Sequence, residues 1–245
     1  MKFNVVTIFP YELSQALSYG VIGNAIKRDK IKINYFDPRI HADNKHDSID
    51  DKPYGGGPGM VMQATPVLQS IEEARGESSD IPVFFLSPQG KKFKQKKAKE
   101  LSKLDQIIIV SSRYEGLDQR AIDQTANHEE ISIGDFILSG GETACAVVID
   151  SIARLIPGVL GDDESVIEES FSNGLLEYPH YTRPSEVNGQ GVPEILLSGD
   201  HEKINQWRKV QSLKNTFIKR PDLIDRAKLT DDEIEIIDSI KNDPE

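Results

Sequence analysis

Residues 131–142 have the sequence Ile131-Ser-Ile-Gly-Asp-Phe-Ile-Leu-Ser-Gly-Gly-Glu142, and this stretch decides the fold. It starts as an apolar run, which predicts a strand over 131–138, and it ends in a glycine pair. Apolar side chains then recur at helical spacing up to Ile156, and Pro157-Gly158 ends that helix. A strand, a glycine turn and a helix in this order place backbone groups at the carboxyl edge of a sheet. Open α/β sheets bind their ligands at this edge.

Two other apolar runs end in the same way. Residues 81–86 precede Ser87-Pro-Gln-Gly90, and residues 106–110 precede Ser111-Ser-Arg-Tyr-Glu-Gly116. Further strands are predicted over 2–8 and 31–36, and helices over 11–28, 60–75 and 92–103. We therefore expect a parallel α/β sheet in which three strand-end loops meet and form one pocket. The chain has neither G-x-G-x-x-G nor G-x-x-x-x-G-K-[ST], which excludes the usual dinucleotide and P-loop fingerprints.

The C-terminal third has a different character. Residues 161–169 are polar and acidic and lack periodicity, which is typical of a linker. Helices are predicted over 196–213 and 230–241. We expect an α/β domain over 1–160, a flexible linker over 161–170 and a small all-helical domain over 171–245.

The composition is that of a soluble globular protein, with 245 residues, 38% hydrophobic and 28% charged. A single cysteine excludes an intrachain disulfide and a cysteine-based metal cluster. Cys145 falls on the apolar stripe of the predicted helix, so we expect a core residue and no nucleophile. We find no signal-peptide pattern and no apolar run of membrane-spanning length, and we expect a cytoplasmic protein without a membrane partner.

The net charge of −11 argues against a nucleic-acid partner, because neutralisation of phosphates drives such binding. The distribution of charge along the chain weakens this argument, because basic residues are concentrated in two segments. Six lysines fall within residues 91–99, and a second basic group lies between Arg208 and Arg220. A lysine run is either a solvated helix face or a nucleic-acid surface, and the sequence alone favours the first. The six residues are Lys91, Lys92, Lys94, Lys96, Lys97 and Lys99.

Several other motifs admit two readings. The glycine cluster Tyr54-Gly-Gly-Gly-Pro-Gly-Met60 allows a backbone to approach a ligand closely, or forms a plain turn. The segment Arg113-Tyr-Glu-Gly116 could bind a ligand, because it carries a cation, an aromatic ring that can stack on a base and a carboxylate that can bind an ammonium group. Alternatively, it forms only an ion pair at the end of a strand. The acidic residues of the linker either include a general base or are simply solvated, and the candidates are Glu164, Glu168 and Glu169.

Arg154 and the segment 180–184 each have a purely structural explanation when they are considered alone. Arg154, on the helix after the glycine pair, is typical of a surface ion pair. The segment His180-Tyr-Thr-Arg-Pro184 is typical of a packed turn, and a metal role is not favoured because no second histidine stands at ligand spacing.

Taken in order, these segments resemble the bacterial tRNA (guanine-N1-)-methyltransferase family over about residues 1 to 230. The resemblance rests on an ordered set of motifs at near-constant spacing, each of them weak alone. They are Asp50 to Met60, Leu86-Ser-Pro-Gln-Gly90, Arg113-Tyr-Glu-Gly116, Ser132-Ile-Gly-Asp135, Leu138-Ser-Gly-Gly-Glu142, Ile156 to Gly161, Glu169-Ser-Phe171, Pro179 to Pro184 and Val192 to Gly199.

This resemblance implies a homodimer of the SPOUT type, whose parallel sheet carries a deep C-terminal trefoil knot. It implies methyl transfer from S-adenosylmethionine to N1 of guanine 37 of tRNA, next to the anticodon, with the active site at the subunit interface. It also implies magnesium dependence, although no metal-site spacing is visible. In this reading the lysine run and the C-terminal helices face the tRNA backbone.

The resemblance also assigns residues. Glu169 takes the place of the general base and Arg154 that of the catalytic arginine. The cofactor-binding positions are Leu86, Ser87, Pro88, Gln89, Gly90, Ser112, Tyr114, Glu115, Gly116, Ser132, Ile133, Gly134, Asp135, Phe136, Ile137, Leu138, Gly140 and Gly141. The substrate-binding positions are Asp50, Tyr54, Gly55, Gly59, Ser165, His180, Arg183 and Arg208.

Three positions depart from the family pattern. The family's base is an aspartate, whereas Glu169 is one methylene longer, and the role could instead shift to Glu168. Ser111-Ser112 replaces a Cys-Gly or similar small pair, and Ala144 replaces a common proline. Two alternatives follow. One is a related knotted methyltransferase with another RNA target, such as a ribose 2′-hydroxyl. The other is an RNA-binding protein that has lost catalysis.

Overall fold

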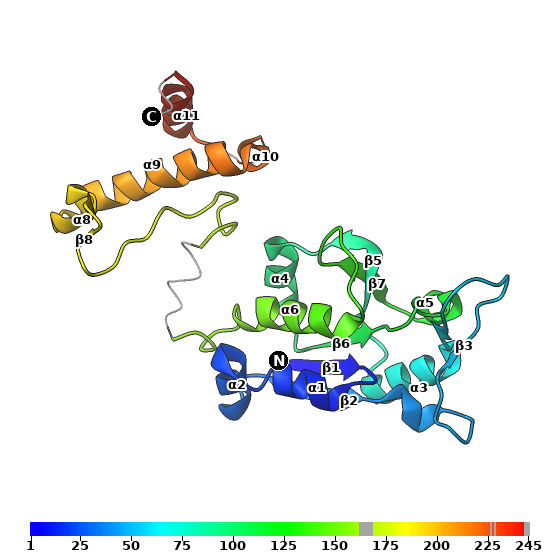
Figure 1. Cartoon of the computed structure of the whole chain (residues 1–245). Coiled ribbons are helices and arrows are strands. Elements are labelled where there is room, and N and C mark those ends of the chain that lie inside the picture. Colours follow the sequence, from blue (N-terminus) through cyan, green and yellow to red (C-terminus); the bar gives the residue numbers. More distant parts are fainter. Residues whose placement is uncertain (162–168, 226, 228, 243–245) are drawn as a thin grey trace. The chain divides into compact units, whose positions relative to one another are not determined.

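The structure is a computed structural model, and it describes residues 1–161, 169–225, 227 and 229–242. The chain divides into two compact units, Met1–Gly161 and Asp162–Glu245 (Figure 1). Most of the expected linker, residues 162–168, lies outside the described residues. Each unit is therefore described by itself.

The first unit is built on a five-stranded sheet with the order β2-β1-β6-β5-β7 (Figure 1). All neighbouring strands are parallel. The carboxyl ends of the strands therefore share one edge, and the expected parallel α/β sheet is confirmed. The strands are β1 (Lys2–Val6), β2 (Lys32–Phe36), β5 (Val83–Lys92), β6 (Gln106–Ser111) and β7 (His128–Ser132).

Helices cover both faces of this sheet, which explains why its central strands are continuous apolar runs. Ile107 and Ile109 of β6 belong to the core cluster on one face, and Ile108 and Val110 belong to the cluster on the other. The first face is covered by α1 (Pro10–Ala16), α2 (Gly20–Lys27), α4 (Gln95–Leu101) and α6 (Gly141–Ala153). The second is covered by α3 (Ala64–Arg75) and α5 (Gln119–Gln124).

The strand expected over 131–138 is wrong after Ser132, and the observed strand begins earlier, at His128. β7 ends at Ser132, whose hydroxyl donates to the carbonyl of Gly134 at 3.0 Å and accepts from its N–H at 3.2 Å. Gly134 has φ +155°, so the chain turns away from the sheet at this point. The apolar residues that follow become a loop, and α6 then begins at Gly141.

The segment 87–90 does not end its strand as expected, because β5 continues to Lys92. Leu86 and Lys91 both pair with Ile131, so the segment between them bulges out of the ladder. Gly90 lies at the return to the ladder. A Cβ there would come within 2.4 Å of the Glu130 carbonyl carbon, so only glycine fits this position.

Three helices expected in the first unit are shorter than predicted. Of the helix over 92–103, only Gln95–Leu101 is helical, as α4. The helix over 11–28 is divided in two before Gly20, whose φ is +62°. The helix over 60–75 begins at Ala64, because β4 (Val61–Met62) instead pairs antiparallel with β3 (Asp50–Asp51). A 3-10 turn, η1 (Pro38–His41), precedes this pair.

The second unit is mainly helical, and its longest element is α9 (His201–Lys219). The expected helix over 196–213 is interrupted at Gly199, with φ +73°, and Asp200 then caps α9 by accepting from the N–H of Lys203. The other helices are α8 (Glu194–Leu197), α10 (Pro221–Ile224) and α11 (Asp231–Asn242). The expectation of an all-helical unit is wrong in one place, where β8 (Glu186–Val187) and β9 (Gln190–Gly191) form a hairpin.

Within the described residues, every helix falls short of the combination of length and apolar character that spanning a membrane requires. Cys145 is fully buried in the first core cluster, as expected.

Candidate active site

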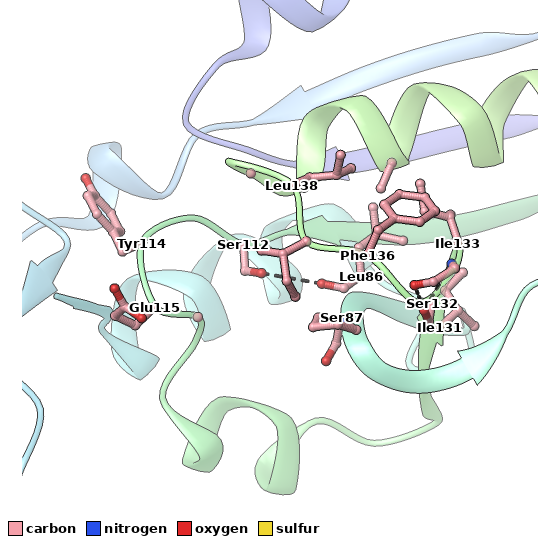
Figure 2. Close-up of a pocket in the computed structure, with 17 residues that line it drawn as sticks. Leu86, Ser87, Ser112, Tyr114, Glu115, Ile131, Ser132, Ile133, Phe136 and Leu138 are labelled. Carbon is pink, nitrogen blue, oxygen red and sulfur yellow. Dashed lines mark hydrogen bonds between the residues drawn. The ribbon is translucent and has the colours of Figure 1, made fainter. Parts of the chain in front are cut away.

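A cavity of about 390 Å³ opens at the carboxyl edge of the sheet in the first unit (Figure 2). Three loops line it: the bulge after Leu86, the turn after β6 and the long loop between β7 and α6. These are the three strand-end loops that the sequence predicts to meet in one pocket. The lining residues are Leu86, Ser87, Pro88, Ser112, Tyr114, Glu115, Gly116, Ile131, Ser132, Ile133, Gly134, Phe136, Ile137, Leu138, Gly140, Gly141 and Ala144.

Three predicted cofactor residues do not line the cavity. The N–H of Gln89 donates to the hydroxyl of Ser87 at 3.2 Å, which shapes the bulge. Gly90 packs against the backbone of β7. Asp135 accepts from Lys92 at 2.5 Å, in an ion pair exposed to solvent.

Sequence reasoning missed two lining residues, Ile131 and Ala144. Ile131 is the last apolar residue before the turn of β7, and Ala144 lies in the first turn of α6. Both are nearly buried, so their sequence signal is that of the core. The small Ala144 side chain limits how far the first turn of α6 reaches into the cavity.

Hydrogen bonds tie the three loops together. The Ser112 hydroxyl donates to the carbonyl of Leu86 at 3.4 Å (Figure 2). The N–H of Gly141 donates to the carbonyl of Ser112 at 2.9 Å. The serine at position 112 therefore fits this loop and supplies a bond between two walls of the cavity.

The turn after β6 carries two polar side chains at the cavity, from Tyr114 and Glu115 (Figure 2). Tyr114 adopts φ +61° and is half exposed. Partial burial, followed by the charge and hydrogen bond of Asp50, raises the pKa of Tyr114 above its usual value. A predicted substrate residue and a predicted cofactor residue are therefore in contact.

The glycine segment 55–59 is attached to the same turn. The N–H of Glu115 donates to the carbonyl of Met60 at 2.9 Å, and the N–H of Met62 donates to the carbonyl of Gly116 at 2.9 Å. Gly55 and Gly59 both adopt positive φ, at +85° and +76°. The segment is exposed, and the Tyr54 side chain is 97% exposed.

An apolar rim completes the cavity. Phe136, Ile137 and Leu138 expose 53%, 80% and 38% of their surface, which is unusual for side chains of this size. Figure 2 shows Phe136 and Leu138 beside the cavity. Such a rim suits a flat apolar group of a ligand or of a partner.

Arg154 is the C-cap of α6, where its N–H donates to the carbonyl of Asp150 at 3.1 Å. It is partly buried and does not line the 390 Å³ cavity. The predicted general base belongs to the other unit, so no distance between these two residues is defined.

In the second unit, Glu169 lines a cleft of about 460 Å³ together with Arg208 and Lys209 of α9. The chain that follows Glu169 is held along α9, since the N–H of Leu176 donates to the hydroxyl of Thr216 at 2.9 Å. The Glu169 carboxylate thus lies in a cleft that also contains cationic side chains.

Of the remaining predicted substrate residues, Arg208 lines this cleft and His180 lies against Tyr178, which also lines it. The Arg208 guanidinium stacks over the ring of Tyr178 at 4.9 Å, and the His180 ring lies 4.8 Å from the same ring. Arg183 is exposed. Ser165 lies outside the described residues, as does Glu168.

Half of the lysine run is engaged with carboxylates. Lys91 lies 3.9 Å from Glu129, Lys97 contacts the same side chain, and Lys92 pairs with Asp135. These pairs weaken the positive field of the run, which the sequence alone could not show. Lys94, Lys96 and Lys99 are exposed on or beside α4.

Among the described residues, no three His, Cys, Asp or Glu side chains gather in a way that could hold a metal ion. A magnesium site therefore finds no support in this part of the chain.

The family model described as tRNA (Guanine-1)-methyltransferase TrmD matches residues 1–226. The chain belongs to this family. Among tRNA (guanine-N(1)-)-methyltransferases, the protein of Buchnera aphidicola subsp. Schizaphis graminum is 51% identical over 239 residues, which are 98% of this chain and 91% of that protein.

Relatives from two other bacteria carry the same name. The protein of Caldanaerobacter subterraneus subsp. tengcongensis is 48% identical over 233 residues, 95% of each chain. That of Pseudoalteromonas atlantica is 46% identical over 242 residues, 98% of this chain and 91% of the relative. The resemblance to tRNA (guanine-N1-)-methyltransferases that the ordered motifs indicated is therefore confirmed.

Proposed function

We propose that this chain transfers a methyl group from S-adenosylmethionine to N1 of guanine 37 of tRNA. Membership of the tRNA (Guanine-1)-methyltransferase family supports the reaction. One observation carries the proposal beyond family membership: the three loops that the resemblance assigns to the cofactor line a single cavity in this chain.

The cavity fits a ligand of this kind. Its volume of about 390 Å³ lies in the range of small-molecule pockets. The Glu115 carboxylate suits the ammonium group of the amino-acid end, and the rim of Phe136, Ile137 and Leu138 suits an adenine ring. When bound, S-adenosylmethionine supplies an electrophilic methyl group, so the protein has to position the reactants and remove a proton.

Two side chains perform the remaining chemistry in this proposal. N1 of guanine carries a proton at neutral pH, and the Glu169 carboxylate accepts it as general base. Negative charge then develops on guanine O6, where the Arg154 guanidinium stabilises it. The target base leaves the anticodon stack, at a cost of about a few kcal/mol.

The proposal needs residues of both units, since Arg154 belongs to the first and Glu169 to the second. We propose a cytoplasmic homodimer whose parallel sheet carries a deep C-terminal trefoil knot, with its active site at the subunit interface. In this proposal Asp50, Tyr54, Gly55, Gly59, Ser165, His180, Arg183 and Arg208 contact tRNA. A requirement for Mg²⁺ would follow from the family resemblance alone, and no step is assigned to the ion here.

Nucleoside mass spectrometry tests the reaction. An unmodified tRNA transcript is incubated with the protein and S-adenosylmethionine, digested to nucleosides and separated. We expect N1-methylguanosine. A ribose-methylated nucleoside would replace the proposal with a different methyltransferase, and cofactor binding without any methylated nucleoside would favour an RNA-binding protein.

A further inference from the structure

A buried carboxylate lies behind the glycine wall of the cavity. Glu142, in the first turn of α6, is 7% exposed and does not line the cavity. One of its oxygens accepts from Arg113 Nε at 2.7 Å, and the other accepts from the Thr7 hydroxyl at 2.9 Å. Both oxygens are therefore engaged, as a buried carboxylate requires.

The Arg113 guanidinium connects this carboxylate to the loop in front of α6. Its Nη1 donates to the carbonyl of Ser139 at 3.2 Å, and its Cζ lies 4.5 Å from the centre of the Phe9 ring. The Phe9 N–H in turn donates to the Thr7 hydroxyl at 3.1 Å. One ion pair thus joins the end of β1, the turn after β6 and the start of α6.

The glycine pair lies pressed between this network and the turn after β6. A Cβ at Gly140 would come within 2.1 Å of Arg113 Nε. A Cβ at Gly141 would come within 2.8 Å of the Ser111 Cα. Both glycines line the cavity on their other side. Arg113 therefore sets the position of Gly140 on the side away from the cavity. The hydrogen bond from the Gly141 N–H to the Ser112 carbonyl holds Gly141 in place.

We propose that Arg113 and Glu142 are positioning residues for the cofactor. They hold the turn 139–141 in the place where it forms a wall of the cavity, and Thr7 supports them through Glu142. This inference deepens the proposed function and rests on it. It concerns the cofactor alone, so it separates binding of S-adenosylmethionine from binding of tRNA.

The network is suited to this task because its parts depend on one another. Removing one partner of a buried ion pair leaves the other charge without compensation. Arg113 also makes its bonds in a fixed fork that a lysine ammonium cannot reproduce. When Glu142 is replaced, the Arg113 guanidinium is free to move. When Arg113 is replaced, the new side chain is free to move. In both cases the backbone at Ser139 and Gly140 loses its support.

The test measures ligand affinity and steady-state kinetics on the full chain. Glu142→Gln keeps the shape and removes the charge, and Arg113→Lys keeps the charge and removes the fork. Arg120→Lys is the matched control, because Arg120 makes a comparable ion pair with Asp118 at 2.7 Å that is exposed and away from the cavity. Calorimetric titration with S-adenosylhomocysteine gives Kd, and methyl transfer gives kcat and both KM values.

We expect Kd for S-adenosylhomocysteine and KM for S-adenosylmethionine to rise about tenfold or more in both variants, equivalent to about 1.4 kcal/mol. KM for tRNA, and kcat at saturating cofactor, should change by less than about threefold. A merely structural role would lower the folded fraction and hence kcat, and leave the Kd of the folded molecules unchanged. The control should match the wild type.

Thr7→Val is a milder variant for the case in which Glu142→Gln or Arg113→Lys fails to fold. It removes one hydrogen bond to Glu142 and keeps the shape of the Thr7 side chain. We expect a smaller rise in Kd, about two- to fivefold. Unchanged cofactor affinity in the folded variants would overturn the positioning role while the proposed function stands. A wild-type chain that binds no S-adenosylhomocysteine would overturn both.

Discussion

Gly59 lies against the side chain of Glu115, so closely that a Cβ at position 59 would fall 2.3 Å from the carboxylate Oε1. The glycine segment therefore fixes the place of the Glu115 carboxylate at the cavity. This contact joins a predicted substrate segment to a predicted cofactor residue.

Replacement of Gly59 by alanine should weaken cofactor binding. The new Cβ would displace the Glu115 side chain, and φ +76° adds strain of about 1–2 kcal/mol. Gly76→Ala is the matched control, since Gly76 has φ +60° and no neighbour within 4 Å of an added Cβ. Titration with S-adenosylhomocysteine should show a higher Kd for Gly59→Ala alone. An equal change in both variants would assign the effect to strain and remove the role of the Gly59–Glu115 contact.

Glu169→Ala and Arg154→Ala should lower methyl transfer by about 10²- to 10⁴-fold, because they remove the proposed base and the group that stabilises the O6 charge. Circular dichroism and cofactor affinity should stay at wild-type values. Glu169→Asp should retain most of the activity, since it restores the family's own residue. Glu235→Ala, at an exposed position of α11, is a control for a lost carboxylate. Near wild-type turnover in both alanine variants would show that the roles are wrongly assigned.

The phenol of Tyr114 should titrate above the ordinary pKa of 10.0, because burial and then Asp50 disfavour its anion. Since the pKa is raised on folding, this contribution to stability is present below pH 10 and is lost as pH rises through the folded value. Ultraviolet difference titration of wild type against Tyr114→Phe isolates the group. Asp50→Asn should bring the pKa partway down, as burial remains. No change in Asp50→Asn would mean that the two side chains do not interact in solution.

The Cys145 thiol should resist thiol reagents in the native protein at neutral pH. Burial raises its pKa to about 12, and the side chain has no exposed surface. Its contribution to stability is present below the unfolded pKa and is lost as pH rises towards about 12. Labelling should become fast in denaturant. Fast labelling without denaturant would contradict the packing of α6 against the sheet.

The main features of the first unit were predictable because its signals are local. Runs such as 107–110 are apolar at every position, as expected for a strand that is buried on both faces. Glycines and serines follow these runs directly. The parallel sheet and the gathering of the three loops follow from those two patterns.

The features that were predicted wrongly or missed have physical causes that the amino-acid sequence does not show. Phe136, Ile137 and Leu138 are as apolar as a strand, but they form an exposed rim, so the predicted strand ran too far. The bulge after Leu86 depends on pairing with Ile131, a contact between distant segments. The sequence allowed a strand-end ion pair in the Arg113 motif, but it could not identify Glu142 as the partner, because 29 positions separate the two residues.

The most direct test of the proposed function compares two unmodified tRNA transcripts that differ at one base. One has guanine at position 37 after guanine at position 36, and the other has adenine at position 37. Transfer of labelled methyl from S-adenosylmethionine to the first alone is the expected result. Equal transfer to both transcripts, or transfer to neither with the cofactor bound, would contradict it.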